Sequence, residues 1–237
     1  MRKIKFLAII PARAGSKRLP GKNIKEFGGK PLINWTIECA TSVVDIDEVV
    51  VSTDCLEIAR VATEAGAIVP FLRPASLGTD SSTSYDVIKN IIDSYDDAGV
   101  DVENIILLQP TSPLRTEESL KGAIKTFQEK SAGSLIAVTK SDHPSHIYGE
   151  LGKGGCLAKM SSNIANAEKK HKAQTYRING AIYIFNKVLL LKKKTLFFKE
   201  RAFSYIMPKI ESVDIDTIED FVAAEALLKY KIDCMVY

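Results

Sequence analysis

The sequence predicts an α/β protein in which a mostly parallel sheet lies between two layers of helices. Short apolar runs rich in β-branched residues alternate along the chain with amphipathic helical patterns. These runs are apolar throughout, which is typical of parallel strands that helices cover on both faces. With 237 residues, 46% of them hydrophobic, the chain is long enough to bury one large core.

The elements of the first half follow one another without a break. In the first helix, Leu32, Trp35 and Ile37 are spaced to share one face. Gly66 is expected to close the second, because glycine readily adopts the left-handed conformation that ends many helices. In chain order we expect strands at 4–11, 48–52, 67–72 and 104–108, and helices at 31–43, 55–65, 84–95 and 117–128.

A strand at 135–138 precedes a break in this rhythm between about 142 and 176. The break contains Pro144, three glycines between 152 and 155, and a lysine-rich polar run. We therefore expect a single domain over 1–237 with an excursion from the sheet at 142–176. The core is expected to resume with strands at 181–185 and 203–207 and to end in a helix at 217–229.

Bulk composition excludes several classes of protein. A net charge of +3 and a pI near 8.5 are too mild for a nucleic-acid-binding surface. No apolar run approaches the ~18 residues of a membrane helix, and the apolar start meets Pro11 at once, as a strand does and a signal peptide does not. The four cysteines include no CxxC pair, so we expect free thiols and a cytoplasmic location.

A basic loop with two glycines follows the first predicted strand. Residues 11–23 read Pro-Ala-Arg-Ala-Gly-Ser-Lys-Arg-Leu-Pro-Gly-Lys-Asn. Loops at the carboxyl ends of the strands bind ligands in α/β sheets, and backbone amides with Lys and Arg suit a triphosphate. The spacing fits neither a Walker loop nor GxGxxG. On charge alone, a solvated basic loop is the alternative.

An acidic pair precedes the last predicted helix. Asp214 and Asp216 are two residues apart, so in an extended segment their carboxylates point the same way. Hard oxygen ligands suit Mg²⁺, which keeps several waters and binds substrate phosphates. Asp216 has a structural alternative as the cap of the helix, and Thr217 with Asp220 as a capping pair. We predict a Mg²⁺ site at Asp214 and Asp216.

The segment 10–23 resembles the signature loop of the acylneuraminate cytidylyltransferases, also called CMP-sialic acid synthetases. The resemblance runs from about residue 6 to residue 225 through five motifs in the expected order. It implies a nucleotidyltransferase-like, Rossmann-like fold. It also implies transfer of CMP from CTP to the anomeric hydroxyl of a nonulosonic acid, N-acetylneuraminate or a close relative, with release of pyrophosphate.

The same resemblance implies the nucleotide contacts. In the basic loop they are Arg13, Lys17, Lys22 and Asn23, with the first three on the phosphates. Residues 72–80 and the serines that follow resemble the cytosine-recognition segment, with Arg73 and Ser84 as its candidates. Ser84 also has a structural alternative, because a serine-rich stretch before a helix is typical of an N-cap.

Two segments resemble the sugar-binding motifs of the family. Residues 107–116, Leu-Leu-Gln-Pro-Thr-Ser-Pro-Leu-Arg-Thr, carry the glutamine that faces the sugar. Residues 176–185, Tyr-Arg-Ile-Asn-Gly-Ala-Ile-Tyr-Ile-Phe, carry a cation suited to a sugar carboxylate, although the family often has proline where this chain has Ile178. The implied sugar contacts are Gln109, Arg177, Asn179, Tyr183, Phe197 and Phe198. For the two phenylalanines, core packing is the alternative.

The excursion at 142–176 keeps apolar residues but has no core of its own, so we expect a second copy of the chain to bury them. In the family such a dimerisation arm reaches over the partner's sugar pocket with cations. By position these are His146 and Lys169, with Lys170 close by, although the family has lysine where this chain has His146. The alternative is an arm folded back on its own subunit.

The implied chemistry depends on positioning and charge neutralisation, which dominate nucleotidyl transfer. The catalytic residues would be Arg13, Lys22, Asp214 and Asp216 with Mg²⁺, acting on CTP and the sugar acid without a nucleic-acid or membrane partner. One alternative is the 3-deoxy-manno-octulosonate enzyme, against which the complete glutamine motif and the Arg-x-Asn-Gly strand argue. The other is a nucleotide-binding regulator without catalysis, against which the intact acidic pair argues.

Overall fold

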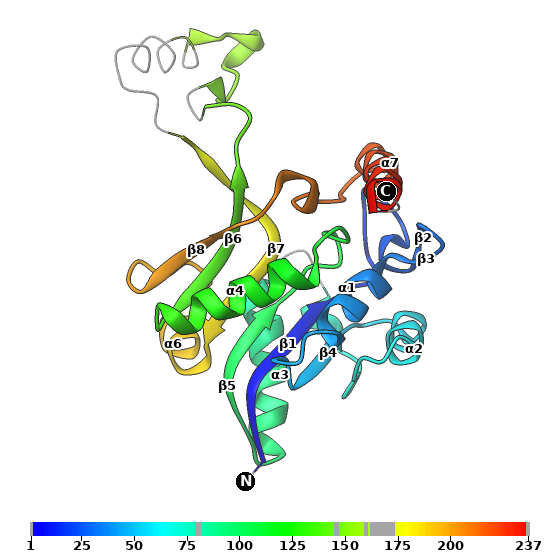
Figure 1. Cartoon of the computed structure of the whole chain (residues 1–237), viewed down its shortest axis with the longest axis vertical. Helices are drawn as coiled ribbons and strands as arrows, with labels where there is room; N and C mark the ends of the chain where they lie inside the picture. Colours follow the sequence, from blue (N-terminus) through cyan, green and yellow to red (C-terminus); the bar gives the residue numbers. More distant parts are fainter. Residues whose placement is uncertain (1, 79–81, 145–146, 159–160, 162–173, 236–237) are drawn as a thin grey trace.

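A computed structural model describes residues 2–78, 82–144, 147–158, 161 and 174–235. Within these residues a six-stranded sheet forms the centre, with the strand order β4-β1-β5-β7-β6-β8 (Figure 1). Strand β1 pairs in parallel with β4 and β5, and β6 with β8, whereas β7 is antiparallel to both its neighbours. The strands, in chain order, are β1 (Arg2–Pro11), β4 (Glu48–Ser52), β5 (Val100–Leu107), β6 (Ser134–Lys140), β7 (Tyr176–Asn186) and β8 (Ala202–Ile206). The predicted mostly parallel sheet is confirmed.

Helices cover both faces of this sheet. Helices α1 (Leu32–Thr41), α2 (Leu56–Glu64) and α4 (Glu117–Glu129) bury apolar side chains on one face. Helices α3 (Ser84–Asp97) and α6 (Lys187–Lys193) do so on the other. Figure 1 shows α4 in front of the sheet and α3 behind it. The predicted three-layer architecture is therefore confirmed, and it follows from strands whose successive side chains point to opposite buried faces.

The last helix, α7 (Ile218–Met235), lies outside the three layers and packs on the hairpin of β2 (Glu26–Phe27) and β3 (Lys30–Pro31) (Figure 1). The ring of Phe27 meets those of Trp35 and Phe221 edge-on, with centroid distances of 6.0 and 5.4 Å. Leu19 and Ile215 belong to the same small apolar cluster. The cluster therefore joins the loop after β1 to the segment that precedes α7.

One predicted strand is absent from the structure, and one strand runs against the others. Residues 67–72 do not form a strand: Ile68 makes a single bridge with Val50, and Pro70, two residues on, has no N–H to donate to a ladder. Strand β7 runs antiparallel, because the excursion between β6 and β7 returns the chain beside β6 as a hairpin does. An apolar run fits either direction, so the sequence pattern of 181–185 was compatible with both.

Beyond the sheet, residues 141–144 and 147–158 extend past the ends of β6 and β7, at the top of Figure 1. Ser141 N donates to Thr175 O across 2.9 Å and closes the base of this excursion. Tyr148, Leu151 and Leu157 are exposed there. The predicted arm cations His146, Lys169 and Lys170 lie outside the described residues. In the part of the chain that the structure describes, no helix is long and apolar enough to cross a bilayer.

Candidate active site

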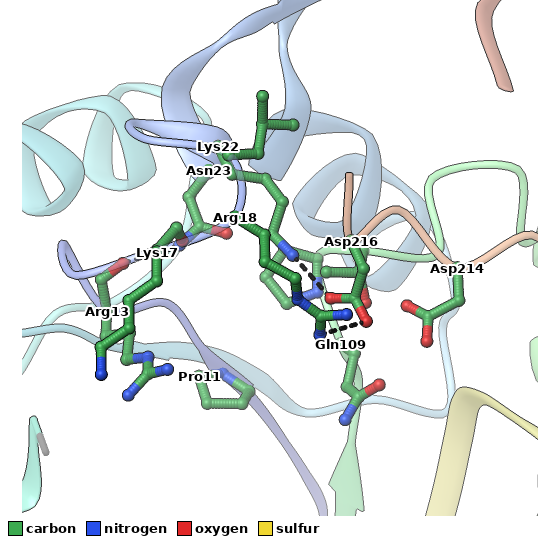
Figure 2. Close-up of a pocket in the computed structure, with 13 residues that line it drawn as sticks. Pro11, Arg13, Lys17, Arg18, Lys22, Asn23, Gln109, Asp214 and Asp216 are labelled. Carbon is green, nitrogen blue, oxygen red and sulfur yellow. Dashed lines mark hydrogen bonds and ion pairs between the residues drawn. The ribbon is translucent and has the colours of Figure 1, made fainter. Parts of the chain in front are cut away.

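The candidate site lies at the edge of the sheet where β1, β4 and β5 have their carboxyl ends. A cavity of about 510 Å³ opens at this edge. Its walls come from the loop after β1, from the turn after β5, and from the segment before α7 (Figure 2). Strand β7 begins at the same edge, because it is antiparallel to β5 and pairs Tyr183 with Leu107.

The loop after β1 forms the basic wall of the cavity. Gly21 adopts a positive φ of 66° and starts the short helix η1 (Lys22–Ile24), a conformation that glycine adopts without strain. Within the loop, Asn23 Nδ2 donates to Arg13 O across 3.0 Å, and Ala14 N donates to Asp54 Oδ1 across 2.9 Å. All four contacts predicted in this loop line the cavity: Arg13, Lys17, Lys22 and Asn23.

The acidic pair lines the opposite wall, and both carboxylates face the same cavity, as predicted (Figure 2). Asp216 Oδ2 accepts from Arg18 Nη2 across 2.8 Å, and its Oδ1 accepts from Lys22 Nζ across 3.2 Å. Lys22 Nζ also donates to Ile215 O across 2.7 Å. Two cations of the loop, Arg18 and Lys22, therefore contact Asp216 directly.

The helix cap is a separate arrangement. Asp220 accepts from the backbone N–H groups of Asp216 and Thr217 at 3.1 and 2.8 Å. The predicted pair of Thr217 and Asp220 is confirmed. The structural alternative for Asp216 is wrong, because Thr217 caps the helix: its Oγ1 accepts from Asp220 N across 3.3 Å, and the Asp216 carboxylate remains on the cavity wall.

Electrostatics set Asp214 apart within the site. Although it opens onto the cavity, desolvation by the surrounding protein raises the pKa of Asp214, and the charge of Asp216 adds to this effect. A hydrogen bond with the Thr111 side chain and the charge of Lys22 act in the opposite direction. The site therefore concentrates negative charge where a cation would relieve it.

A smaller cavity of about 240 Å³ adjoins the first and shares Pro11 and Arg13 with it. Arg73 and Ser84, the predicted base contacts, both line it. Arg73 is only 5% exposed, and its Nη2 lies 3.8 Å from Asp54 Oδ1. Among the described residues its Nε has no hydrogen-bond partner, and burial lowers its pKa. A buried guanidinium with unused donors beside a cavity suits a polar ligand.

The alternative of an N-cap region is confirmed for this stretch, but the capping residue is Thr83 and not Ser84. Thr83 caps α3: its Oγ1 accepts from Asp86 N across 3.2 Å, and the Asp86 carboxylate accepts from Thr83 N in return. Ser84 is the first residue of the helix proper. Its base contact stays a prediction.

On the sugar side, Gln109 lines the cavity and lies against Gly180 of β7. Gly180 has a φ of +77°, and a Cβ added there would lie 2.5 Å from Gln109 Oε1 and 3.8 Å from Asp214 Oδ2. The pairing of β7 with β6 shifts register at this point, between Ile136 and Val138. Glycine is thus needed both for the backbone conformation and for the close approach.

The other residues predicted on β7 do not line this cavity. Arg177 is exposed, and its Nη2 donates to Ser212 O across 3.0 Å. Asn179 is 1% exposed; its Nδ2 donates to Ser212 Oγ across 2.9 Å and its Oδ1 accepts from Ala181 N across 3.1 Å. Asn179 therefore holds the backbone of β7 at the register shift beside Gly180, in place of the predicted direct contact with the sugar.

Of the three aromatic residues predicted to contact the sugar, two are buried in the core and one is exposed. Tyr183 is 8% exposed and stacks on Phe185 on the α3 side of the sheet, and burial, reinforced by the charge of Asp214, raises its pKa. Phe198 packs against Phe185 in the core, which agrees with the alternative of core packing, whereas Phe197 is exposed. The last predicted contact, Lys169, lies outside the described residues.

Sequence reasoning missed several residues at this edge. Arg18 belongs to the basic loop and had no predicted role, although it pairs with Asp216. Asp54 holds both the loop and Arg73, and its position directly after a strand at the ligand edge was the available signal. For Gly180 the signal was a glycine inside a strand, which often marks a bulge or a close approach.

Comparisons with known proteins agree with this geometry. A sequence profile described as Cytidylyltransferase matches residues 7–234. The chain is 36% identical over 237 residues to CMP-N,N'-diacetyllegionaminic acid synthase of Legionella pneumophila, covering 98% of this chain and 100% of that protein. It is 35% identical to N-acylneuraminate cytidylyltransferase of Streptococcus agalactiae serotype V over 92% of this chain, which spans 52% of the streptococcal protein.

Among solved structures, CMP:2-keto-3-deoxy-manno-octonic acid synthetase complexed with CTP has a similar fold. The TM-score is 0.71, over 96% of this chain and 99% of that one, at 18% identity. The nucleotidyltransferase-like fold predicted from the sequence is thereby confirmed. The profile match over nearly the whole length and the two relatives show that this chain belongs to the cytidylyltransferase family.

Proposed function

We propose that this protein transfers CMP from CTP to the anomeric hydroxyl of a nonulosonic acid and releases pyrophosphate. One observation carries the proposal: in a member of the cytidylyltransferase family, a cationic loop and an acidic pair face each other across one cavity. The sugar class is supported by the names of the two relatives, one for an N-acylneuraminate and one for N,N'-diacetyllegionaminic acid.

The nucleotide would span the two adjoining cavities. Its phosphates would bind the loop cations and the backbone of the larger cavity, and its base would enter the smaller one beside Arg73 and Ser84. Arg13 lines both cavities and so stands where the α-phosphate would lie. Arg18 and Lys22, paired with Asp216 in this structure, would gain a second anionic partner in the phosphates.

The residues present fit a magnesium ion. Asp214 and Asp216 offer carboxylate oxygens to one cavity, and burial has already raised the pKa of Asp214. The described residues contain no cluster of three or more His, Cys, Asp or Glu that could enclose a metal. This suits Mg²⁺, which takes one or two carboxylates and completes its shell with phosphate and water. When bound, the ion would neutralise the charge of the phosphates.

The reaction is an in-line displacement. The anomeric oxygen of the sugar forms a bond to the α-phosphorus, and the bond from that phosphorus to the oxygen bridging to the β-phosphate breaks. Pyrophosphate leaves with this electron pair, and the hydroxyl proton is released. Arg13 and Lys22 would stabilise the charge that develops on the phosphates, and Gln109 would orient the sugar. Arg177, which is exposed at the start of β7, would meet the sugar carboxylate as the substrate enters.

We further infer a homodimer. The apolar side chains exposed on the excursion, Tyr148, Leu151 and Leu157, require a covering surface, and edge strand β8 exposes Phe203 and Ile206. A symmetric pair of arms would cover them and bring arm cations to the partner's sugar pocket.

All four cysteines are free thiols, which supports a reducing, cytoplasmic compartment.

The test is a substrate panel. Purified protein is given CTP, Mg²⁺ and, in separate reactions, N-acetylneuraminate, N,N'-diacetyllegionaminate and 3-deoxy-manno-octulosonate, and pyrophosphate release is measured. We expect turnover with a nine-carbon acid and little with the eight-carbon sugar. Turnover with the eight-carbon sugar alone would refute the substrate class, and no turnover with any sugar would refute the activity.

A further inference from the structure

Arg115 is a fully enclosed cation at the inner end of the active-site turn. It is 4% exposed, and its guanidinium donates to Gln109 O at 2.8 Å, Ala181 O at 2.9 Å and Thr36 Oγ1 at 3.4 Å. It also has a side-chain hydrogen bond with Cys39. None of the described carboxylates forms an ion pair with it. Burial lowers the pKa of Arg115 to about 10, so the group remains charged at neutral pH.

An enclosed charge without a counter-ion is costly, so its position needs a reason. The strand register supplies one. The ladder between β5 and β7 ends with the pair Leu107 and Tyr183. Gln109 and Ala181 lie two residues beyond that pair along the chain, where a continued antiparallel ladder would have its next pair of the same hydrogen-bonding type. The guanidinium bonds both of their carbonyls, and so bridges the two strands where direct pairing has stopped.

The same two residues flank the sugar side of the cavity. Gln109 presents its side chain to the cavity, and Ala181 follows Gly180, whose backbone lies against Gln109 Oε1. Arg115 therefore fixes the backbone on both sides of this contact. The nucleotide contacts, on the loop after β1 and the start of α3, receive no bond from Arg115.

We propose that Arg115 is a positioning residue that holds β5 and β7 apart at the cavity and thereby sets where Gln109 meets the sugar acid. The inference rests on the proposed function. A planar fork of donors can bond two carbonyls in fixed directions while also reaching Thr36, whereas a lysine ammonium is a single point on a flexible stem. Arg115→Lys keeps the charge and loses the bridge.

The test separates the two substrates. In Arg115→Lys we expect the KM for the nonulosonic acid to rise about tenfold while the KM for CTP changes by less than about twofold. Phe127→Leu, a core change in α4 on a residue outside the cavity, is the matched control for lost stability. Both variants are assayed well below their melting temperatures. A purely structural role for Arg115 would lower the melting temperature of Arg115→Lys and leave both KM values where they are.

A double-mutant cycle tests whether Arg115 acts through Gln109. If it does, adding Arg115→Lys to Gln109→Ala should raise the KM for the sugar by much less than tenfold, about twofold or less. Effects that multiply in full would overturn the inference. If Arg115→Lys does not fold, Gly180→Ala perturbs the same contact from β7 and should give the same selective rise; an unchanged KM for the sugar would then overturn it.

The two proposals fail in different ways. Wild-type protein that turns over no nonulosonic acid would refute the proposed function and this inference together. If the wild-type protein is active and the KM for the sugar is the same in Arg115→Lys, only the inference about Arg115 is refuted.

Discussion

Lys22 and Asp216 are 194 positions apart in the chain, and the Nζ of Lys22 lies 3.2 Å from Oδ1 of Asp216. The contact joins the basic loop after β1 to the acidic segment before α7. It does not stand alone, because Leu19 and Ile215 pack in one apolar cluster just behind it. Packing of α7 on the β2–β3 hairpin thus sets the distance between the two charged walls of the cavity.

Gly28 tests this packing. It has a φ of +55°, and a Cβ there would overlap Leu228 and lie 3.1 Å from the Trp35 ring. We expect Gly28→Ala to lower the free energy of unfolding by about 2–3 kcal/mol, from strain and overpacking together. Gly29→Ala, with a φ of +87° and open space around it, should cost only the backbone strain, about 1 kcal/mol. Equal losses in urea unfolding would show that Gly28 is not packed as described.

Different residues should control the affinity for nucleotides and the preference for cytosine over uracil. Arg13→Ala should weaken CTP and UTP alike, by about tenfold, because phosphates carry no base identity. Lys25→Ala is its control, because Lys25 is a cation just after this loop that lies over the Phe221 ring and outside the cavity. Ser84→Ala should instead erode the preference for CTP over UTP, and Ser94→Ala, further along the same helix, should not. Initial rates with both nucleotides give the answer; an intact preference in Ser84→Ala would place the base elsewhere.

Asp214 and Asp220 should respond oppositely to pH. The folded-state pKa of Asp214 is raised, so the folded protein binds more protons than the unfolded chain between the two pKa values, and stability falls as pH rises through that window. Asp214→Asn should therefore raise the melting temperature at neutral pH, and the gain should vanish in acid.

For Asp220, burial acts to raise the pKa, but the hydrogen bonds from Thr217 and Asp216 outweigh it, and the net pKa is lowered. Its contribution is present above the unfolded pKa and lost as pH falls through the folded one. Asp220→Asn should thus lower the melting temperature at neutral pH. Shifts of the same sign in the two variants would contradict this assignment of charge.

The sequence predicted the architecture well where a local pattern determines it. The helix at 117–128 and the strand at 48–52 were found nearly to the residue, and Thr116 caps α4 as a threonine before a helix should. Contacts between residues that are far apart in the sequence were harder to predict. Lys22 and Asp216 were each singled out, but nothing local states that they touch.

The sugar side was predicted least well, for a physical reason. A regular strand would place Arg177, Asn179 and Tyr183 on one face. The irregularity at Gly180 breaks that alternation and sends Asn179 toward Met207 and Tyr183 toward α3. Periodicity cannot show where a strand departs from its own period.

Mixed dimers test the proposed arm. We combine an Asp216→Asn chain with a chain carrying Lys169→Ala and Lys170→Ala, each inactive alone. If the arm acts in trans, one site in each mixed dimer has an intact core and an intact arm, so activity should return on mixing. Persistent inactivity in verified mixed dimers would mean that the arm serves its own subunit.

The central claim is that the cavity at the carboxyl edge joins CMP to a nonulosonic acid. The most direct measurement is a single-turnover reaction with CTP labelled at the α-phosphate, Mg²⁺, the sugar acid and an excess of protein. The account predicts that the label moves into a conjugate with the mass of CMP plus the sugar, with an equal amount of pyrophosphate. It also predicts a rate at least about 100-fold lower in Asp216→Asn or with EDTA. Label that stays in CTP, or that appears only as free CMP, with every nonulosonic acid would contradict it.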